Sequence, residues 1–289
     1  MNEHFLEYIE IKNHKCFDDF RAEGFKRVNL IGGKNNVGKT AFLEGCYVNV
    51  YSQSRASFVS ALINVRYLRD EINILVQEVQ ESGTLHRQGK TFIEKSDKFS
   101  TQSNVNETHF EIHENQGIKE YHCKFAGEDF SVNANEFSLD ARHLSNITFL
   151  NHIGLNNTNF ETLFSTIQRK DAEERVNRYL QSFDNEITGF KMINQIPHCK
   201  KNGEYFELSN FGDGLKHFIS IIISLFHCEN GYLFIDEIDT GIHYSKLKLI
   251  WDIVFELSQE FGVQVFVTTH SKECITSYEQ SARKNSKGD

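Results

Sequence analysis

A strand-like run that leads through glycines into a helix constrains this chain more than any other feature. The segment VNLIGGKNNVGKTAFLEG, residues 28–45, begins with an apolar entry typical of a buried strand. Gly33 and Gly38 follow, then Lys39, Thr40 and an apolar pattern with helical spacing. In the spacing G-x-x-x-x-G-K-[ST], the glycines let backbone N–H groups surround phosphates, the lysine reaches the terminal phosphates, and the hydroxyl reaches Mg²⁺. The segment therefore predicts a phosphate-binding loop at a helix N-terminus.

A glycine turn beside a surface lysine is the alternative interpretation of the same letters. The strand-like entry and the helix-like exit are the context that the phosphate-binding motif requires, so we favour the loop. ATP and Mg²⁺ are the predicted cofactors, with GTP left open as the nucleotide. The residues predicted to bind ATP are Gly33, Asn35, Asn36, Gly38, Lys39, Thr40 and Ala41.

A second motif, GYLFIDEIDTGIHY at residues 231–244, places two carboxylates after a short apolar run. This order is typical of a buried parallel strand that delivers charge at its carboxyl edge. We expect Asp236, together with Thr40, to bind Mg²⁺, and Glu237 to orient and deprotonate the attacking water. A solvated acidic pair at a strand end is the alternative, and the first motif makes it the weaker one.

The segment VQVFVTTHSKE, residues 263–273, repeats this logic with a histidine. An apolar strand pattern ends in Thr-Thr-His270-Ser, which predicts His270 at the same sheet edge as the carboxylates. There it could donate to the terminal phosphate or its water, so we assign it a catalytic role beside Glu237. A lone histidine is more often structural, but its place after the acidic motif favours function.

Composition limits the remaining choices. The 289 residues are 39% hydrophobic with a single proline, which predicts one compact unit without linkers. No long apolar run or signal-peptide pattern is present, so we expect a cytoplasmic protein without membrane contact. Six scattered cysteines predict reduced thiols. A formal charge of −9 disfavours DNA binding by the chain alone, although a local basic patch stays open.

Together the motifs resemble ABC-type ATPase heads of the RecF, OLD (overcoming lysogenization defect) and structural-maintenance-of-chromosomes (SMC) branch. The segments LSNFGDGLKHFISIIISLFHCENGYLFIDEIDTGIHYSKL and VQVFVTTHSKEC are similar to small bacterial AAA-family ATPases of OLD-like and PARIS-type anti-phage systems, and YIEIKNHKCFDDF resembles the start of that family. The resemblance implies an α/β P-loop NTPase of ABC-ATPase type with an antiparallel β lobe and a helical lobe. We expect a single head over 1–289, with one lobe at about 1–150 plus 230–289 and a helical signature lobe at about 151–229.

The same resemblance assigns a role to the glycine-bearing stretch before the acidic strand. In such families the corresponding segment is a signature loop that reaches the γ-phosphate bound by a partner chain. It implies a homodimer or higher homo-oligomer in which the loop acts in trans. The loop residues carried over are Ser209, Gly212, Asp213 and Gly214. Residues 239–243 would let the two sites sense each other, although His243 stands where transporter relatives usually have aspartate.

The remaining segments predict structure around these motifs. Alternating patterns at about 90–135 predict antiparallel strands, and helical patterns are found at 55–82 and 161–183. His109 and His113 suggest zinc, but four strand residues span about 13 Å, too far for one ion. The short tail after His270 leads us to expect an incomplete or mobile C-terminal sheet edge.

The resulting functional hypothesis is an ATPase that dimerises around ATP and acts as a switch for a separate effector in anti-phage defence. No acidic cluster of the TOPRIM nuclease kind is found in the sequence, so a TOPRIM-type nuclease is a candidate for the effector rather than for this chain. A RecF-like, ATP-dependent DNA clamp is the alternative function. A non-catalytic nucleotide-binding scaffold is disfavoured because Lys39, Asp236, Glu237 and His270 are all present.

Overall fold

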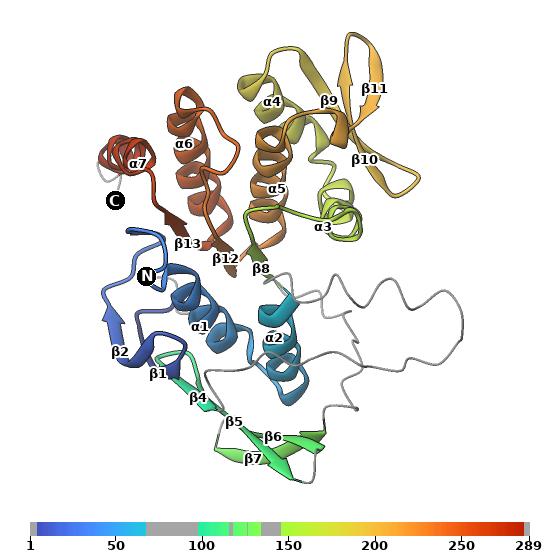
Figure 1. Ribbon diagram of the computed structural model, residues 1–289. Helices are drawn as coiled ribbons and strands as arrows, with labels where there is room; N and C mark the ends of the chain where they lie inside the picture. The colour runs from blue at the N-terminus through green and yellow to red at the C-terminus, as the bar shows by residue number, and fades with distance from the viewer. Residues whose placement is uncertain (1–4, 68–97, 116–117, 126, 134–145, 286–289) are drawn as a thin grey trace. The chain divides into compact units, whose positions relative to one another are not determined.

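The computed structural model describes residues 5–67, 98–115, 118–125, 127–133 and 146–285 (Figure 1). The chain divides into two compact units. Unit 1 comprises residues 1–5, 25–43 and 145–289, and unit 2 comprises residues 6–24 and 44–144. The lobe boundaries expected near residues 150 and 230 stay a prediction.

Unit 1 is built on a four-stranded parallel sheet. Its strands lie in the order β3 (Val28–Gly32), β13 (Gln264–Thr269), β12 (Tyr232–Ile235) and β8 (Ile147–Leu150). Every residue of β12 and β13 is buried, which explains their continuous apolar runs. Because all four strands are parallel, their carboxyl ends share one edge, and the residues just beyond each strand meet there.

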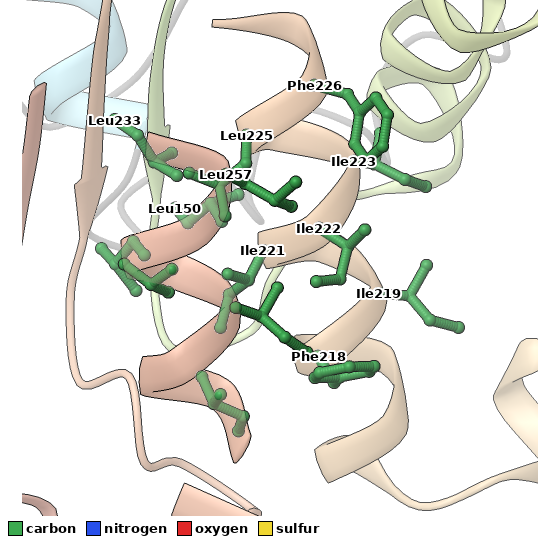
Figure 2. Close-up of a cluster of buried hydrophobic side chains, with 14 of the residues drawn as sticks. Leu150, Phe218, Ile219, Ile221, Ile222, Ile223, Leu225, Phe226, Leu233 and Leu257 are labelled. Carbon is green, nitrogen blue, oxygen red and sulfur yellow. The ribbon is translucent and has the colours of Figure 1, made fainter. Parts of the chain in front are cut away.

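Unit 1 also contains five helices that come after β8 in the chain, with β12 and β13 among them. They are α3 (Asn157–Arg169), α4 (Glu173–Phe183), α5 (Asp213–His227), α6 (Tyr244–Phe261) and α7 (Lys272–Asn285). The apolar helix α5 is buried along nearly its whole length, between α3 and α6. In Figure 2, Ile221 and Leu225 point toward Leu257 of α6, whereas Ile219 and Ile223 point away from it. Within the described residues, no helix has the length and apolar character that crossing a membrane requires.

One predicted helix is interrupted. The pattern over 161–183 predicted a continuous helix, but the chain forms α3 and α4 with a break between them. Asp171 has a φ of 50°, in the left-handed region, which ends the first helix and redirects the chain. The apolar residues that give this segment its helical pattern are buried on both helices: Leu163, Ile167, Val176 and Leu180.

A small antiparallel sheet packs against these two helices. Its strands are β9 (Ile187–Ile193), β10 (Ile196–Lys201) and β11 (Glu204–Glu207), and a short 3-10 helix, η2 (Leu208–Asn210), follows. Both hairpins turn through two left-handed residues, at 194–195 and at 202–203. The second turn has the sequence Asn-Gly, which is a strong hairpin signal.

Unit 2 contains a six-stranded antiparallel sheet in the order β2-β1-β4-β5-β6-β7. The strands are β1 (Tyr8–His14), β2 (Phe17–Glu23), β4 (Lys98–Ser103), β5 (Glu107–Asn115), β6 (Ile118–Phe125) and β7 (Glu128–Asn133). The antiparallel strands expected at 90–135 are thus confirmed from residue 98 to 133. Helix α2 (Arg55–Tyr67) confirms the first part of the 55–82 helix, and the rest lies outside the described residues.

Helix α1 (Lys39–Tyr51) begins in unit 1, and its residues from Glu44 onward belong to unit 2. The carboxylate of Glu44 is buried and forms an ion pair with Lys15, which follows β1. Gly45 lies so close to Ile11 that an added Cβ would meet its Cδ1 at 2.7 Å. Inside unit 2, these contacts hold the last turns of the helix against the first strand.

The Arg175 side chain provides a test of the helix packing in unit 1. Its guanidinium donates to both carboxylate oxygens of Glu260 at 2.6 Å and lies 5.2 Å from the centre of the Phe226 ring. Arg175 also lowers the pKa of Glu260. Because both side chains are partly exposed, we expect Arg175→Ala to lower the free energy of unfolding by only about 1–2 kcal/mol, measured by urea denaturation.

Arg283 is the matched control, since its pair with Glu279 is a long contact of 3.9 Å on the surface of α7. Arg283→Ala should change the unfolding midpoint little. If Arg175→Ala and Arg283→Ala lowered the free energy of unfolding equally, the two hydrogen bonds from Arg175 to Glu260 would have no special stabilising role.

Candidate functional site

The predicted phosphate-binding loop connects β3 to α1. The backbone N–H of Gly33 donates to the carbonyl of Thr269 at 3.3 Å, which ties the start of the loop to the neighbouring strand. The ammonium of Lys39 donates to the carbonyls of Gly33 and Lys34, at 3.1 and 2.9 Å, so it lies inside the curve of the loop. Lys39 is only 9% exposed. A lysine held in this way presents its charge to an anion in the loop.

Backbone conformation explains two of the loop positions. Gly38 has a φ of 96°, a left-handed conformation that glycine adopts without strain. Asn36 also lies in the left-handed region, with a φ of 61°, which asparagine tolerates better than most residues. Asn35 and Asn36 are exposed, and Ala41 is buried in the first turn of α1. The loop therefore leads its backbone N–H groups toward the N-terminus of a 13-residue helix, where the dipole favours anions.

The carboxylate of Asp236 joins three segments of the site. It accepts hydrogen bonds from the Thr40 hydroxyl at 2.9 and 3.1 Å and from the Thr268 hydroxyl at 2.6 Å. Asp236 is 8% exposed, and its backbone N–H donates to the carbonyl of Leu150 in β8. The two residues predicted to bind Mg²⁺, Thr40 and Asp236, are thus in direct contact. Their hydroxyl and carboxylate oxygens are hard ligands that suit Mg²⁺.

Thr268 is a site residue that the sequence analysis did not single out. Its side chain is fully buried and has two roles, because the hydroxyl donates to Asp236 and accepts from the backbone N–H of Glu237 at 2.9 Å. The parallel pairing of β12 with β13 brings these residues together. A polar residue inside an otherwise apolar strand pattern was the available signal in the sequence.

Glu237 and His270 lie together at the same sheet edge. Their side chains approach to 3.6 Å, between His270 Nδ1 and Glu237 Oε1, and both are partly exposed. Glu237 has a φ of 55°, in the left-handed region that glutamate seldom adopts. The two adjacent carboxylates have different partners, because Asp236 accepts from Thr40 and Thr268, whereas Glu237 lies beside His270. This arrangement allows one carboxylate to hold a cation while the other faces solvent water.

The edge strand β8 adds a residue that the sequence left unassigned. Leu150 is paired with Ile235, so Asn151 lies beside Asp236 at the carboxyl end of the sheet. The Asn151 side chain accepts from the backbone N–H of Ile153 at 3.0 Å.

Zinc is not supported by the described part of the chain. No group of three or more histidine, cysteine, aspartate or glutamate side chains there could hold a metal ion. His109 lies 3.8 Å from Glu111 on β5, and the side chain of His113 lies outside the described residues.

The predicted signature segment spans η2 and the start of α5. Ser209 lies in η2, where its hydroxyl donates to Glu207 at 3.2 Å, and the N-cap of α5 is Gly212. Ser209 therefore does not cap the helix, because η2 places it three residues before the N-cap. Asp213 is the first residue of α5 and the acidic residue of its first turn. In the described residues, no hydrogen bond or ion pair joins this segment to the loop at 33–41.

Gly214 brings the start of α5 against the loop that follows the acidic pair. An added Cβ at Gly214 would lie 2.2 Å from the carbonyl oxygen of Gly241, and Gly241 itself has a φ of 70°. In the same loop, the carboxylate of Asp239 accepts from the Thr269 hydroxyl at 2.6 Å. Two backbones can approach this closely only where both residues lack a side chain.

Gly212 and Gly214 form a matched pair for a stability test. An added Cβ at Gly212 meets no atom within 4 Å, whereas at Gly214 it meets backbone at 2.2 Å. We expect Gly214→Ala to lower the thermal midpoint by several degrees through backbone displacement, and Gly212→Ala, which changes only the N-cap of α5, to lower it clearly less. Calorimetry of both variants checks this, and similar midpoints would show that the close approach is not required.

Comparison with known proteins identifies relatives of this chain. An "ATP/GTP phosphatase" of Helicobacter pylori (strain ATCC 700392 / 26695) is 26% identical over 333 residues, covering 96% of this chain and 88% of its own. A solved SMC head bound to the C-winged helix domain of ScpA is 12% identical with a TM-score of 0.50, covering 94% of this chain and 91% of its own, which shows a shared fold. The predicted fold class is thus confirmed as an α/β P-loop NTPase that resembles the SMC head.

The family model AAA_21, described as "AAA domain, putative AbiEii toxin, Type IV TA system", matches residues 28–275. This range includes all three motifs and all the described strands of the parallel sheet. The chain belongs to the AAA_21 family of P-loop ATPases.

Proposed function

We propose that this chain hydrolyses ATP between the loop at residues 33–41 and the acidic pair that follows β12. The carrying observation is that Asp236 accepts from both Thr40 and Thr268, which unites the two motifs at one sheet edge. A phosphate group in the loop would accept hydrogen bonds from the backbone N–H groups and from the Lys39 ammonium. Mg²⁺, held by the Thr40 hydroxyl and the Asp236 carboxylate, would neutralise the phosphate oxygens when bound.

Glu237 is the proposed general base. Its partly exposed carboxylate lies beside the cation site without sharing the hydrogen bonds of Asp236. It can therefore orient a water molecule and accept a proton from it as the water attacks the terminal phosphate. His270, 3.6 Å from Glu237, would position this carboxylate and donate to the phosphate. The name of the Helicobacter pylori relative makes GTP the second nucleotide to test.

The signature segment supports a dimer that closes around nucleotide. Ser209, Gly212 and Asp213 are exposed, and nothing lies within 4 Å of an added Cβ at Gly212. The segment therefore has room to approach a phosphate in a second copy of the chain, where α5 would present its N-terminus. The likeness of the fold to SMC heads supports two heads as the functional assembly.

We further propose that the closed dimer signals to a separate effector in bacterial anti-phage defence, in the cytoplasm. The family description, which refers to a toxin of a toxin–antitoxin system, supports a defence role, as does the resemblance to OLD-like and PARIS-type ATPases. A TOPRIM-type nuclease is a candidate for this effector. Hydrolysis would reset the switch by separating the two heads.

Thr268 offers a test of the site that does not remove a charged group. Thr268→Val keeps the shape of the side chain but deletes the hydroxyl that bonds Asp236 and the Glu237 backbone. We expect the ATP hydrolysis rate to fall at least about tenfold, since both carboxylates lose their positioning. Thr268→Ser, which keeps the hydroxyl, should retain most of the rate. A Val variant as active as wild type in a phosphate-release assay would contradict the proposed geometry.

Glu237→Gln tests the dimer. Loss of the base should slow hydrolysis about 100-fold or more while ATP stays bound, so the closed dimer accumulates. Light scattering should then give twice the monomer mass with Mg-ATP and the monomer mass without it. Adding Ser209→Arg to this variant should abolish the dimer, because a long charged side chain would occupy the approach to the partner's phosphate. An ATP-bound protein that stays monomeric would contradict the proposal that the chain dimerises around ATP.

A further inference from the structure

A buried histidine in α5 has no role in the proposed hydrolysis. His217 lies one turn beyond Gly214, and its side chain is 1% exposed. Neither ring nitrogen has a hydrogen-bond partner in the described part of the chain. In a neutral imidazole, one nitrogen carries a hydrogen and can donate a hydrogen bond, and the other nitrogen can accept one. The structure therefore leaves a buried donor and a buried acceptor unsatisfied.

Two loops of the sheet edge reach α5 near this residue. Gly154, in the loop after β8, has a φ of 78°, and an added Cβ there would lie 3.8 Å from the Cα of His217. The loop after β12 contacts α5 through the pair of Gly241 and Gly214. His217 therefore lies on the turn of α5 that both loops approach, directly after the signature segment.

The charged and titratable groups near the ring identify its available partner. Burial lowers the pKa of His217 to about 4, the charge of Asp239 opposes that change, and His152 and Lys216 add to it. Asp239 accepts from Thr269 through its oxygen Oδ1, which leaves Oδ2 as an acceptor for another donor. Thr269 directly precedes His270, so the same carboxylate is linked to the proposed catalytic edge.

We propose that His217 is a positioning residue that couples the 239–243 loop to the start of α5. When the sheet edge rearranges around bound nucleotide, an imidazole N–H of His217 donates to the carboxylate of Asp239. The inference rests on the proposed function, because it assigns a route by which nucleotide in one site affects the signature segment on the same chain. The unsatisfied ring raises the free energy of the nucleotide-free state, so any rearrangement that gives the ring a partner is favoured.

His217→Leu tests this coupling by removing both unsatisfied atoms at similar volume. Replacing an unsatisfied polar group with an apolar one of similar shape is neutral or stabilising, so the nucleotide-free variant should melt no lower than wild type. Its affinity for ATP should fall roughly fivefold, as expected for the loss of one hydrogen bond formed on binding. Calorimetric titration in the Glu237→Gln background measures this affinity without hydrolysis.

Ser224 provides a matched control on the same helix. Its hydroxyl is also buried without a partner among the described residues, and it lies about two turns farther along α5. Ser224→Ala should leave ATP affinity unchanged. His217→Gln keeps a hydrogen-bond donor and an acceptor, so its affinity for ATP should be closer to that of wild type. This variant also keeps the proposal testable if His217→Leu does not fold. Equal ATP affinity in wild type, His217→Leu and His217→Gln would overturn the proposal.

Nitrogen-15 chemical shifts of the His217 ring give a direct readout that a purely structural role would not change. Selectively labelled Glu237→Gln protein should show a downfield change of one ring nitrogen toward a hydrogen-bonded value when Mg-ATP is added. Unchanged ring shifts in a protein that binds ATP and dimerises would reject the role of His217 and leave the proposed function intact. A protein that does not bind ATP would instead reject the proposed function.

Discussion

The hydrogen bonds to the Asp236 carboxylate are the interactions on which the candidate site depends. They connect the first turn of α1, the end of β12 and the interior of β13, three segments widely separated in the sequence. The parallel sheet makes this meeting possible, because its carboxyl ends share one edge. In a buried setting of low polarity, a carboxylate that lacked these donors would be costly, so the hydroxyls both stabilise the fold and fix the position of the Asp236 carboxylate.

The α5 helix connects this edge to the interior of unit 1. Its apolar residues lie in the hydrophobic core of unit 1, whereas its first turn closely approaches the backbone of the loop after β12 at Gly241. The loop after β12 therefore lies directly against a deeply packed helix, where there is little space for either backbone to shift independently. The small sheet of β9, β10 and β11 is packed against the same group of helices, so it belongs to this body and is not a separate appendage.

The sequence predicted the parts of the structure that depend on local pattern. The strand, glycine and lysine pattern at 28–45 predicted β3, the loop and α1, and the acidic pair was expected at a strand end. The pattern could not reveal contacts set by strand register, and the fully buried Thr268 is the clearest example. The break at Asp171 was missed because a left-handed residue other than glycine leaves no strong signal. The 3-10 helix that separates Ser209 from α5 likewise leaves no clear pattern in the sequence.

The left-handed backbone of Glu237 has a consequence for how this site can evolve. A glutamate at a φ of 55° stores roughly 1–2 kcal/mol of backbone strain that glycine would relieve and asparagine would reduce. Replacing Glu237 with glycine would therefore relieve backbone strain while removing one of the two adjacent carboxylates. Stability and the acidic pair thus make opposite demands on this one position.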